Sequence, residues 1–307
     1  MGEKRQFYIS DLLMIIVGTI WGVNYVFIKI ALREMPPFMF NVLRFIGSSL
    51  FFIIFYRFYI KDFTFIKKYL LQLLFLGIIG HTIMQVLFIK GVSLTSASNA
   101  SLMFATTPLY VGLLCILLKQ QRVTIWTWVG ILLSLIGVML IVKSTGNGLE
   151  FSKKHLWGDV CVLCSSLCWS VFTVFVRPFV KNGSVMAVVA ITIIFGTVFL
   201  IPVGIPDMLK TNWLELSLTS WSMVIISFVF ANIFGYIVWF YSLQKVGSVH
   251  TAIYQNLVPI CGVISASLFL GEQLTMNIVI GGICIIAGIT VTRLSSGIKK
   301  EPYSENI

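Results

Sequence analysis

Long apolar stretches separated by short polar segments run through the whole chain. Several of them reach the roughly 20 residues that a helix needs to cross about 30 Å of hydrocarbon, and Lys and Arg gather at their flanks. The pattern predicts an all-α integral membrane protein with ten transmembrane helices rather than barrel strands. We expect these helices at residues 11–32, 36–56, 69–89, 95–118, 123–143, 156–177, 186–205, 220–243, 249–270 and 275–294.

Composition and charge support this interpretation. The chain is 58% hydrophobic and 11% charged, whereas a soluble domain carries about a quarter charged residues. If the N-terminus is cytoplasmic, the segments on that side hold most of the 22 basic residues, although Lys143, Lys153 and Lys154 fall on the other side. The bias predicts a multi-pass protein with both termini cytoplasmic. Anionic lipid headgroups account for the net charge of +11, so we expect the lipid bilayer as a partner and no nucleic acid.

The chain contains an internal repeat. Asp11, Trp21 and Lys29 align with Asp159, Trp169 and Arg177 at an offset of 148 residues, and Pro108, Gly130 and Gly137 align with Pro259, Gly281 and Gly288 at an offset of 151. Repeats with an odd number of spans must have opposite orientations in the membrane. We therefore expect two inverted five-helix repeats at 1–147 and 148–297, followed by a disordered cytoplasmic tail at 298–307. Two inverted halves offer two nearly equivalent packings, one open to each side, so the repeat predicts alternating access around a site near the midplane.

Four short stretches carry a family resemblance, and they lie in helices one and two, at the start of helix four and before helix ten. The chain resembles the ten-helix EamA group of the drug/metabolite transporter superfamily. The resemblance implies a plasma-membrane secondary transporter, often an exporter of amino acids or related metabolites, with a central cavity between the halves. One departure is that Lys119-Gln120-Gln121-Arg122 stands where the first half should repeat the Gly-Glu turn, so any role of that acid rests on Glu272. The four stretches are Trp21-Gly22-Val23-Asn24 through Lys29, Arg44-Phe45, Ser96–Ala100 and Leu270–Thr275.

Matching polar and aromatic stripes predict the lining of that cavity, because polar side chains at bilayer depth need a partner or a water-lined space. Each of the stripes in helices three and eight, and in helices four and nine, has its counterpart in the other half, and helices one and six add residues expected to face the cavity. The interpretation that these side chains only hydrogen-bond helices together remains open for each of them, as does interfacial anchoring for the two tryptophans. The predicted lining residues are Trp21, Asn24, His81, Gln85, Asn99, Met103, Trp169, Asn232, Tyr236, Trp239, Tyr254 and Gln255.

Charged and titratable residues near this region are candidates for gating or coupling, namely Lys29, Arg44, Arg177, His250 and Glu272. Lys29 and Arg177 lie near helix ends, where they can also reach the headgroups, whereas Arg44 lies deeper and needs an internal partner. Pro108 and Pro259 are predicted to kink helices four and nine.

No Asp or Glu occupies the middle of a predicted helix. A small-molecule solute is the expected partner, and a neutral or carboxylate-bearing one fits best, since a cation would find no buried counter-charge. If protons are coupled to transport, His81 or His250 is the expected titrating group. Uncoupled facilitation of another solute, such as a drug, a purine or a sugar-like molecule, fits equally well.

Other functional classes find less support in the sequence. An enzyme would need a clustered nucleophile and base or a metal set, and neither a phosphate-binding loop nor a hydrolase motif is found. Cys161, Cys164 and Cys168 share a helix face, but small-residue packing explains them better than a metal site. We expect no cofactor and no metal. A receptor role and the oligomeric state stay open.

Overall fold

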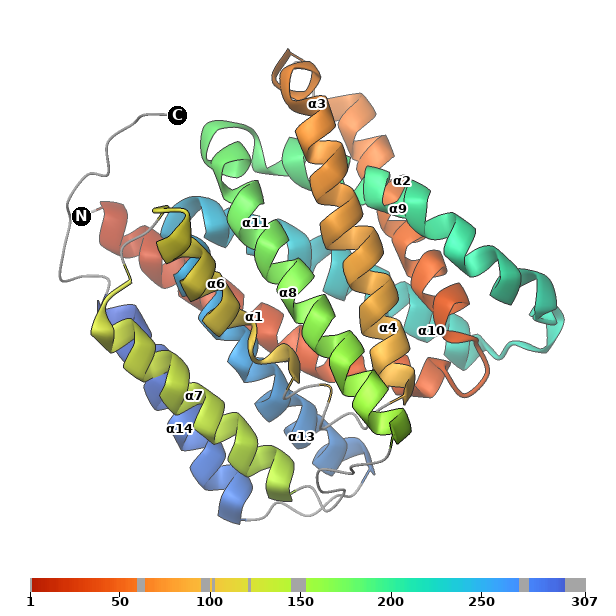
Figure 1. Ribbon diagram of the computed structural model, residues 1–307. Helices are drawn as coiled ribbons and strands as arrows, with labels where there is room; N and C mark the ends of the chain where they lie inside the picture. Colours follow the sequence, from red (N-terminus) through yellow and green to blue (C-terminus); the bar gives the residue numbers. More distant parts are fainter. Residues whose placement is uncertain are drawn as a thin grey trace.

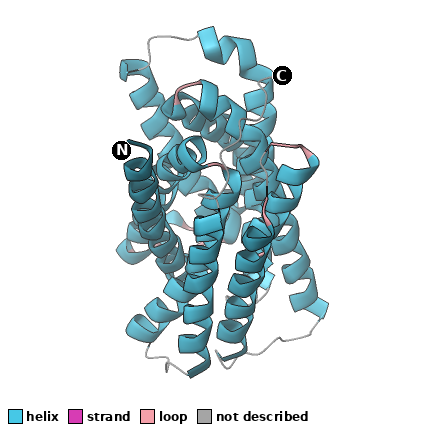
Figure 2. Cartoon of the chain, turned by 90° about the vertical axis from the view of Figure 1, so that its left-hand side faces the viewer, coloured by secondary structure: helices cyan, strands magenta, loops and turns pink. Residues whose placement is uncertain are grey.

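The computed structural model of the chain describes residues 2–59, 64–94, 100, 103–120, 123–144, 153–270 and 276–295. Within these residues all regular structure is helical (Figures 1 and 2). The predicted tail at 298–307 lies outside them. The elements are α1 (Gly2–Ala31), α2 (Pro37–Tyr59), α3 (Thr64–Gly77), η1 (Ile78–Ile83), α4 (Met84–Leu94), α6 (Thr107–Leu117), α7 (Ile125–Ser144), α8 (Lys153–Asn182), α9 (Val185–Lys210), η2 (Trp213–Glu215), α10 (Leu218–Ile226), η3 (Ser227–Phe234), α11 (Gly235–Val246), α12 (Ser248–Ala252), η4 (Ile253–Asn256), α13 (Leu257–Leu270) and α14 (Met276–Ser295).

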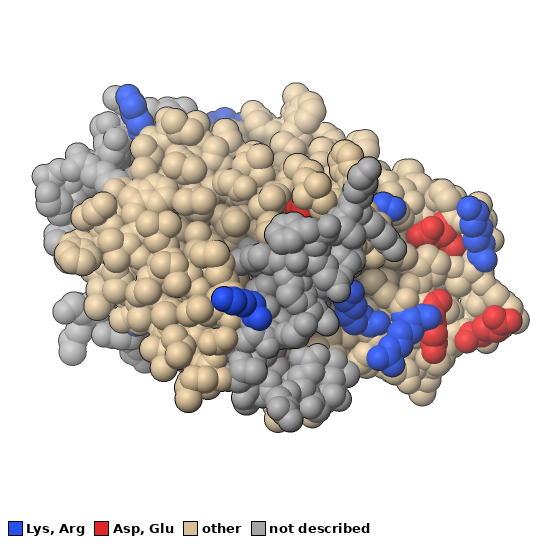
Figure 3. Space-filling view, turned by 60° about the horizontal axis from the view of Figure 1, so that its bottom comes forward, with Lys and Arg blue, Asp and Glu red and all other residues tan. Residues whose placement is uncertain are grey.

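Where the structure describes them, the predicted spans lie mostly on helical segments. The protein has ten transmembrane helices in two inverted five-helix repeats. Six described helical stretches are long and apolar enough to cross a membrane, and three further apolar helices are shorter. Large apolar side chains such as Leu209, Leu268 and Ile283 are more than half exposed. In one face of the molecule the charged side chains gather mainly at one end, while most of the described surface is uncharged (Figure 3). A surface of this kind is suited to lipid rather than water.

Three hydrogen bonds mark the pseudo-twofold axis, because each joins a residue to its counterpart in the other repeat. Ser49 of α2 donates to Thr197 of α9 over 2.7 Å, at a separation of 148 residues. Gln85 of α4 donates to the Tyr236 hydroxyl of α11 over 3.2 Å, at a separation of 151 residues. Ser134 of α7 donates to the Ile285 carbonyl of α14 over 3.5 Å, again 151 residues away. The offsets found in the sequence are thus the separations of side chains that meet at the axis.

Helices α7 and α14 lie side by side (Figure 1) and repeat the same close contact on both sides of the axis. An ideal Cβ on Gly130 would lie 2.5 Å from the Gly288 carbonyl oxygen, and one on Gly137 would lie 2.5 Å from the Gly281 carbonyl oxygen. A contact that reappears with its partners exchanged is typical of a twofold arrangement. Glycine is needed here because any side chain would separate the two backbones.

The third and eighth helices both contain a π-helical segment, and the two segments are equivalent. The segment η1 ends at Ile83 and η3 ends at Phe234, which are 151 residues apart. Periodicity alone predicts plain α-helices in both places. π-helical turns often occur at functional sites, and these two directly precede Gln85 and Tyr236 at the axis.

The fourth and ninth helices are interrupted, which corrects the prediction of continuous helices there. α6 begins at Thr107, after a turn at 105–106, and the short 3₁₀ segment η4 separates α12 from α13. Pro108 and Pro259 lie in the first turns of α6 and α13. The backbone N–H groups of a first helical turn have no partner within the helix, so a proline is tolerated there. The two prolines therefore begin helices rather than kink the middle of them.

Candidate functional site

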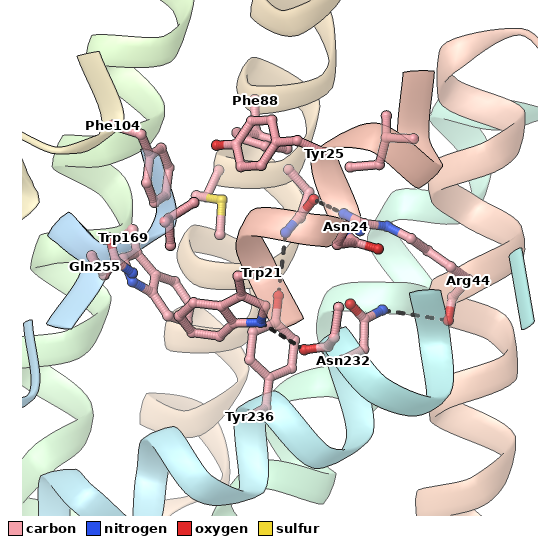
Figure 4. Close-up of a pocket in the computed structure, with 15 residues that line it drawn as sticks. Trp21, Asn24, Tyr25, Arg44, Phe88, Phe104, Trp169, Asn232, Tyr236 and Gln255 are labelled. Atoms are coloured by element: carbon pink, nitrogen blue, oxygen red, sulfur yellow. Dashed lines mark hydrogen bonds between the residues drawn. The ribbon is translucent and has the colours of Figure 1, made fainter. Parts of the chain in front are cut away.

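A cavity of about 80 Å³ lies between the two repeats (Figure 4). A single water needs roughly 10–15 Å³ on this measure, so the space holds several waters or a small solute. Both repeats contribute to its wall. The lining residues are Trp21, Asn24, Tyr25, Ile28, Arg44, Met84, Gln85, Phe88, Phe104, Trp169, Ala231, Asn232, Tyr236, Gln255 and Val258.

Eight of the residues singled out in the sequence meet at this wall. Three pairs of wall residues occupy equivalent positions in the two repeats, namely Trp21 with Trp169, Gln85 with Tyr236, and Phe104 with Gln255. The cavity therefore surrounds the pseudo-twofold axis. The eight are Trp21, Asn24, Arg44, Gln85, Trp169, Asn232, Tyr236 and Gln255.

Arg44 supplies a buried positive charge to this wall, and its side chain is only 3% exposed. Its Nε donates to Asn41 over 2.8 Å, its Nη2 to the Gln85 side-chain oxygen over 2.7 Å and its Nη1 to Ser227 over 3.4 Å. All of these described acceptors are neutral. A guanidinium has five N–H donors, so these bonds leave two of them for other acceptors. Figure 4 shows the side chain reaching toward Asn24 from the α2 side.

Other wall residues present buried polar atoms that make no hydrogen bond in the described structure. They are Asn24 Oδ1, Trp169 Nε1 and Gln255 Oε1. Buried polar groups are normally paired, and these three lie where the cavity leaves room for an acceptor or a donor. The arrangement can hold a small polar molecule.

The wall is closed on one side by packed aromatic rings. Trp169, Phe172, Trp239 and Phe240 are 0–1% exposed, and each ring centroid lies 5.3–5.6 Å from that of another member of this group. Trp239 was predicted to line the cavity, but it lies behind Trp21 and Trp169. The equivalent residue in the first repeat, Phe88, is at the wall.

His81 also lies away from the wall, contrary to the predicted stripe. It is fully buried, its ring packs against Phe45, Phe172 and Tyr236, and both of its nitrogens lack a hydrogen bond. The reason is η1, in which residues bond five positions apart, so that a four-residue spacing no longer keeps His81 above Gln85. Its backbone instead packs closely against Gly196 of α9.

Tyr254 and Met103 are likewise not among the lining residues. The Tyr254 hydroxyl donates to Asp11 over 2.6 Å, and Asp11 forms an ion pair with Arg293. This cluster joins α1, η4 and α14 near the N-terminal end of α1. Met103 is partly buried against the apolar core.

The remaining gating candidates do not reach the cavity. Lys29 Nζ donates to the Val92 carbonyl over 3.5 Å, Arg177 Nη1 donates to the Gln120 carbonyl over 3.4 Å, and His250 is half-buried in α12. The other two residues singled out in the sequence, Asn99 and Glu272, lie outside the described residues.

Sequence reasoning missed several lining residues, although part of the signal was present. Trp21, Asn24, Tyr25 and Ile28 recur at helical spacing and form one face of α1. Trp21 and Asn24 were predicted to line the cavity, and Tyr25 and Ile28 lie on the same face of α1. No comparable signal identifies Met84, Phe104, Ala231 or Val258, because apolar letters are common throughout this chain.

Known proteins agree with this architecture. The family model described as "EamA-like transporter family" matches residues 8–143 and again 156–294. An uncharacterized transporter of Archaeoglobus fulgidus is 29% identical, over 92% of this chain and 96% of its own length. A protein of Salmonella typhimurium named "Probable amino-acid metabolite efflux pump" is 25% identical, over 91% of this chain and 93% of its own length.

A solved crystal structure shares the fold, with a TM-score of 0.78 at 16% sequence identity over 94% of this chain and 97% of the other. At that identity the likeness concerns the fold alone. The family match, in contrast, covers both repeats and nearly the whole chain. The chain is therefore a multi-pass membrane transporter that belongs to the EamA-like transporter family.

Proposed function

We propose that the protein is a secondary transporter that exports a small organic solute bearing a carboxylate, such as an amino acid, by alternating access. The observation that carries this proposal is the Arg44 guanidinium, which is buried at the cavity wall and bonded only to neutral described groups. A buried charge without a counter-charge is costly in a membrane. A carboxylate bound at its remaining N–H groups would supply that counter-charge.

Two further observations support the solute class and the direction. The unpartnered oxygens of Asn24 and Gln255 offer acceptors for an ammonium or hydroxyl group elsewhere on the solute. The name of the Salmonella typhimurium relative points to efflux of amino-acid metabolites. The distribution of basic residues supports cytoplasmic termini, and membership of the transporter family supports a plasma-membrane location. Repeats at 1–147 and 148–297 supply the two halves that alternate.

Uncoupled transport is the favoured energetic mode. None of the described lining residues is Asp, Glu or His, so the wall offers no obvious proton carrier. His81, the nearest candidate, is enclosed by aromatic rings. The solute would then move down its own gradient.

The test uses the purified full chain and matched pairs of solutes, each an amino acid and its carboxamide. Thermal-shift measurements find the solutes that bind, and counterflow in proteoliposomes shows which of them exchange. We expect carboxylates to stabilise and exchange, and carboxamides to be weaker by roughly tenfold or more, since a hydrogen bond to a charged group contributes about 1.5–3 kcal/mol. Equal counterflow of both members of each pair, or robust transport of an organic dication, would overturn the proposal.

A pH gradient across the same proteoliposomes tests the coupling. For uncoupled transport, the solute equilibrates and the gradient drives no accumulation. Accumulation that collapses with a protonophore would instead establish proton coupling.

A further inference from the structure

Trp21 and Trp169 are equivalent residues at the cavity wall, yet their indole N–H groups have different surroundings. Trp21 Nε1 donates to the Ala231 carbonyl in η3 over 2.9 Å. Trp169 Nε1 is buried and makes no hydrogen bond in the described structure. The two ring centroids are only 6.4 Å apart, edge to face.

The acceptor of Trp21 also has a counterpart. At the offset of 151 that relates helices three and eight, Ala231 corresponds to Gly80, which lies in η1. A carbonyl oxygen has two lone pairs and can accept an indole in addition to a helix bond. Trp169 of the second repeat and the Gly80 carbonyl of the first are therefore the counterparts of Trp21 and Ala231, but the described structure has no hydrogen bond from Trp169 Nε1.

The Phe172 ring packs against both members of this second pair, Gly80 and the Trp169 ring. Its ring atoms lie so close to Gly80 that a Cβ there would collide with them. In the first repeat the equivalent of Phe172 is Asn24, which lies at the cavity wall and leaves Ala231 open to Trp21. The Trp21 bond is thus made beside Asn24, at the cavity, whereas Trp169, which packs against the Phe172 ring, makes no corresponding bond in the described structure.

We infer that the two tryptophans form a reciprocal switch, in which each indole bonds the π segment of the other repeat in only one of the two alternating states. The Trp21–Ala231 bond stabilises the present state. In the opposite state Phe172 withdraws from Gly80, Trp169 donates to the Gly80 carbonyl and the Trp21 bond is released. This inference rests on the alternating access proposed above, and it assigns to the two residues a positioning role in the cycle.

Inverted repeats give this exchange its physical basis. The two packings are nearly equivalent, so a bond that exists in only one of them shifts the equilibrium by its full net contribution. A net hydrogen bond of this kind changes the ratio of states by roughly 2- to 10-fold.

The switch is testable without any solute, which separates its failure from that of the proposed function. In a cysteine-free background, Ile28→Cys and Val176→Cys place single thiols at equivalent positions. Both side chains are buried, but Ile28 lines the cavity, whereas Val176 is not among the described lining residues. The rate of maleimide labelling at position 176 then reports the population of the opposite state.

We expect Trp21→Phe to raise the labelling rate at position 176 by about 2- to 10-fold, because the present state loses its bond. Trp169→Phe should lower that rate by a similar factor, because the opposite state loses its own. Trp157→Phe is the matched control, since Trp157 is on the same helix as Trp169 but 68% exposed, and it should leave the rate unchanged.

Gly235→Ala provides an independent route to the same result. An ideal Cβ on Gly235 would lie 2.7 Å from Trp21 Nε1, so the methyl group displaces the indole without removing it. It should raise labelling at position 176 as Trp21→Phe does, even if that variant folds poorly. Melting temperatures confirm that each protein is folded. Shifts in the same direction for Trp21→Phe and Trp169→Phe, or no shift in folded protein for Gly235→Ala and Trp169→Phe, would overturn the inference.

Discussion

The two repeats have the same helical arrangement but contribute different side chains to the cavity. The hydrogen bond between Ser49 and Thr197 aligns α2 with α9, and on that alignment the counterpart of Arg44 is Thr192. In the part of the chain that the structure describes, the Thr192 hydroxyl donates within its own helix, to carbonyls three and four residues earlier. The buried charge of the first repeat thus has no equivalent in the second.

The same contrast holds one helix away, at Asn24 and Phe172. The first is polar and faces the cavity, and the second is an apolar ring packed against Gly80. The two repeats thus fit each other around an axis but place different side chains at these equivalent positions. The comparison shows that the two repeats match where they meet at the axis, whereas the buried charge at the cavity wall comes from the first repeat alone among the described lining residues.

The largest expected effect comes from the part that the repeats share. Gly130→Leu should lower the free energy of unfolding by about 3 kcal/mol, because overpacking at a tight contact costs about 1–3 kcal/mol or more and a Cβ here would lie 2.5 Å from the Gly288 carbonyl. Thermal melting in detergent measures the change. Gly282→Ala is the control, since a Cβ there meets nothing within 4 Å. Equal losses in both variants would show that the α7–α14 contact is not special.

A smaller effect is expected at the axis bond between Gln85 and Tyr236. Tyr236→Phe removes the acceptor of the Gln85 amide, and Gln85→Leu also removes the acceptor of Arg44. A double-mutant cycle on thermal stability should give a coupling of about 1 kcal/mol between the two positions. Strict additivity would mean that the two repeats are not energetically connected at this point.

The smallest effect concerns Glu34, in the turn after α1. Its carboxylate accepts hydrogen bonds from the hydroxyls of Ser220 and Ser217 and from the Ser217 backbone N–H at the start of α10. These bonds hold the pKa of Glu34 below its ordinary value of 4.5. The equivalent residue in the second repeat, Asn182, has no charge to titrate.

The depressed pKa fixes the sign of the pH dependence. The contribution of Glu34 is present above the unfolded pKa and is lost as the pH falls through the folded one. The melting temperature of the wild type should therefore exceed that of Glu34→Gln at pH 7, and the difference should vanish in acid. Asn182→Ala should show no such pH dependence. A Glu34→Gln difference that stays constant as the pH is lowered toward acid unfolding would contradict the assignment.

Much of the fold could be predicted because hydrocarbon imposes simple rules on sequence. The length of the apolar stretches predicted the transmembrane helices. The repeat was predicted from the matches of Trp21, Pro108 and Gly130 with their counterparts in the other half. The separations of 148 and 151 residues then reappear as hydrogen-bonded pairs. The π segments could not be predicted, since η1 and η3 have ordinary helical compositions and their extra residue is accommodated by packing against other helices.

The cavity was predictable only in part. Polar letters such as Asn24, Gln85 and Asn232 stand out in an apolar chain, and they do lie at the wall. The orientation of the Tyr254 side chain was not predictable from the sequence. Its hydrogen-bond partner Asp11 is 243 residues away, and the two meet because α1 packs against η4 and α13. Two of the neutral partners of Arg44, Gln85 and Ser227, were hidden for the same reason, since they lie 41 and 183 residues away in the sequence.

Counterflow of a carboxylate solute by Arg44 variants tests the central claim most directly. Arg44→Gln should reduce counterflow of the best carboxylate by roughly 10- to 100-fold, since the lost hydrogen bonds to a charged group contribute about 1.5–3 kcal/mol, and should largely abolish the preference for that carboxylate over its carboxamide. Arg57→Gln, which removes an exposed charge farther along α2, should leave both unchanged. A folded Arg44→Gln protein that still exchanges the carboxylate at the wild-type rate and with the wild-type preference would contradict the account.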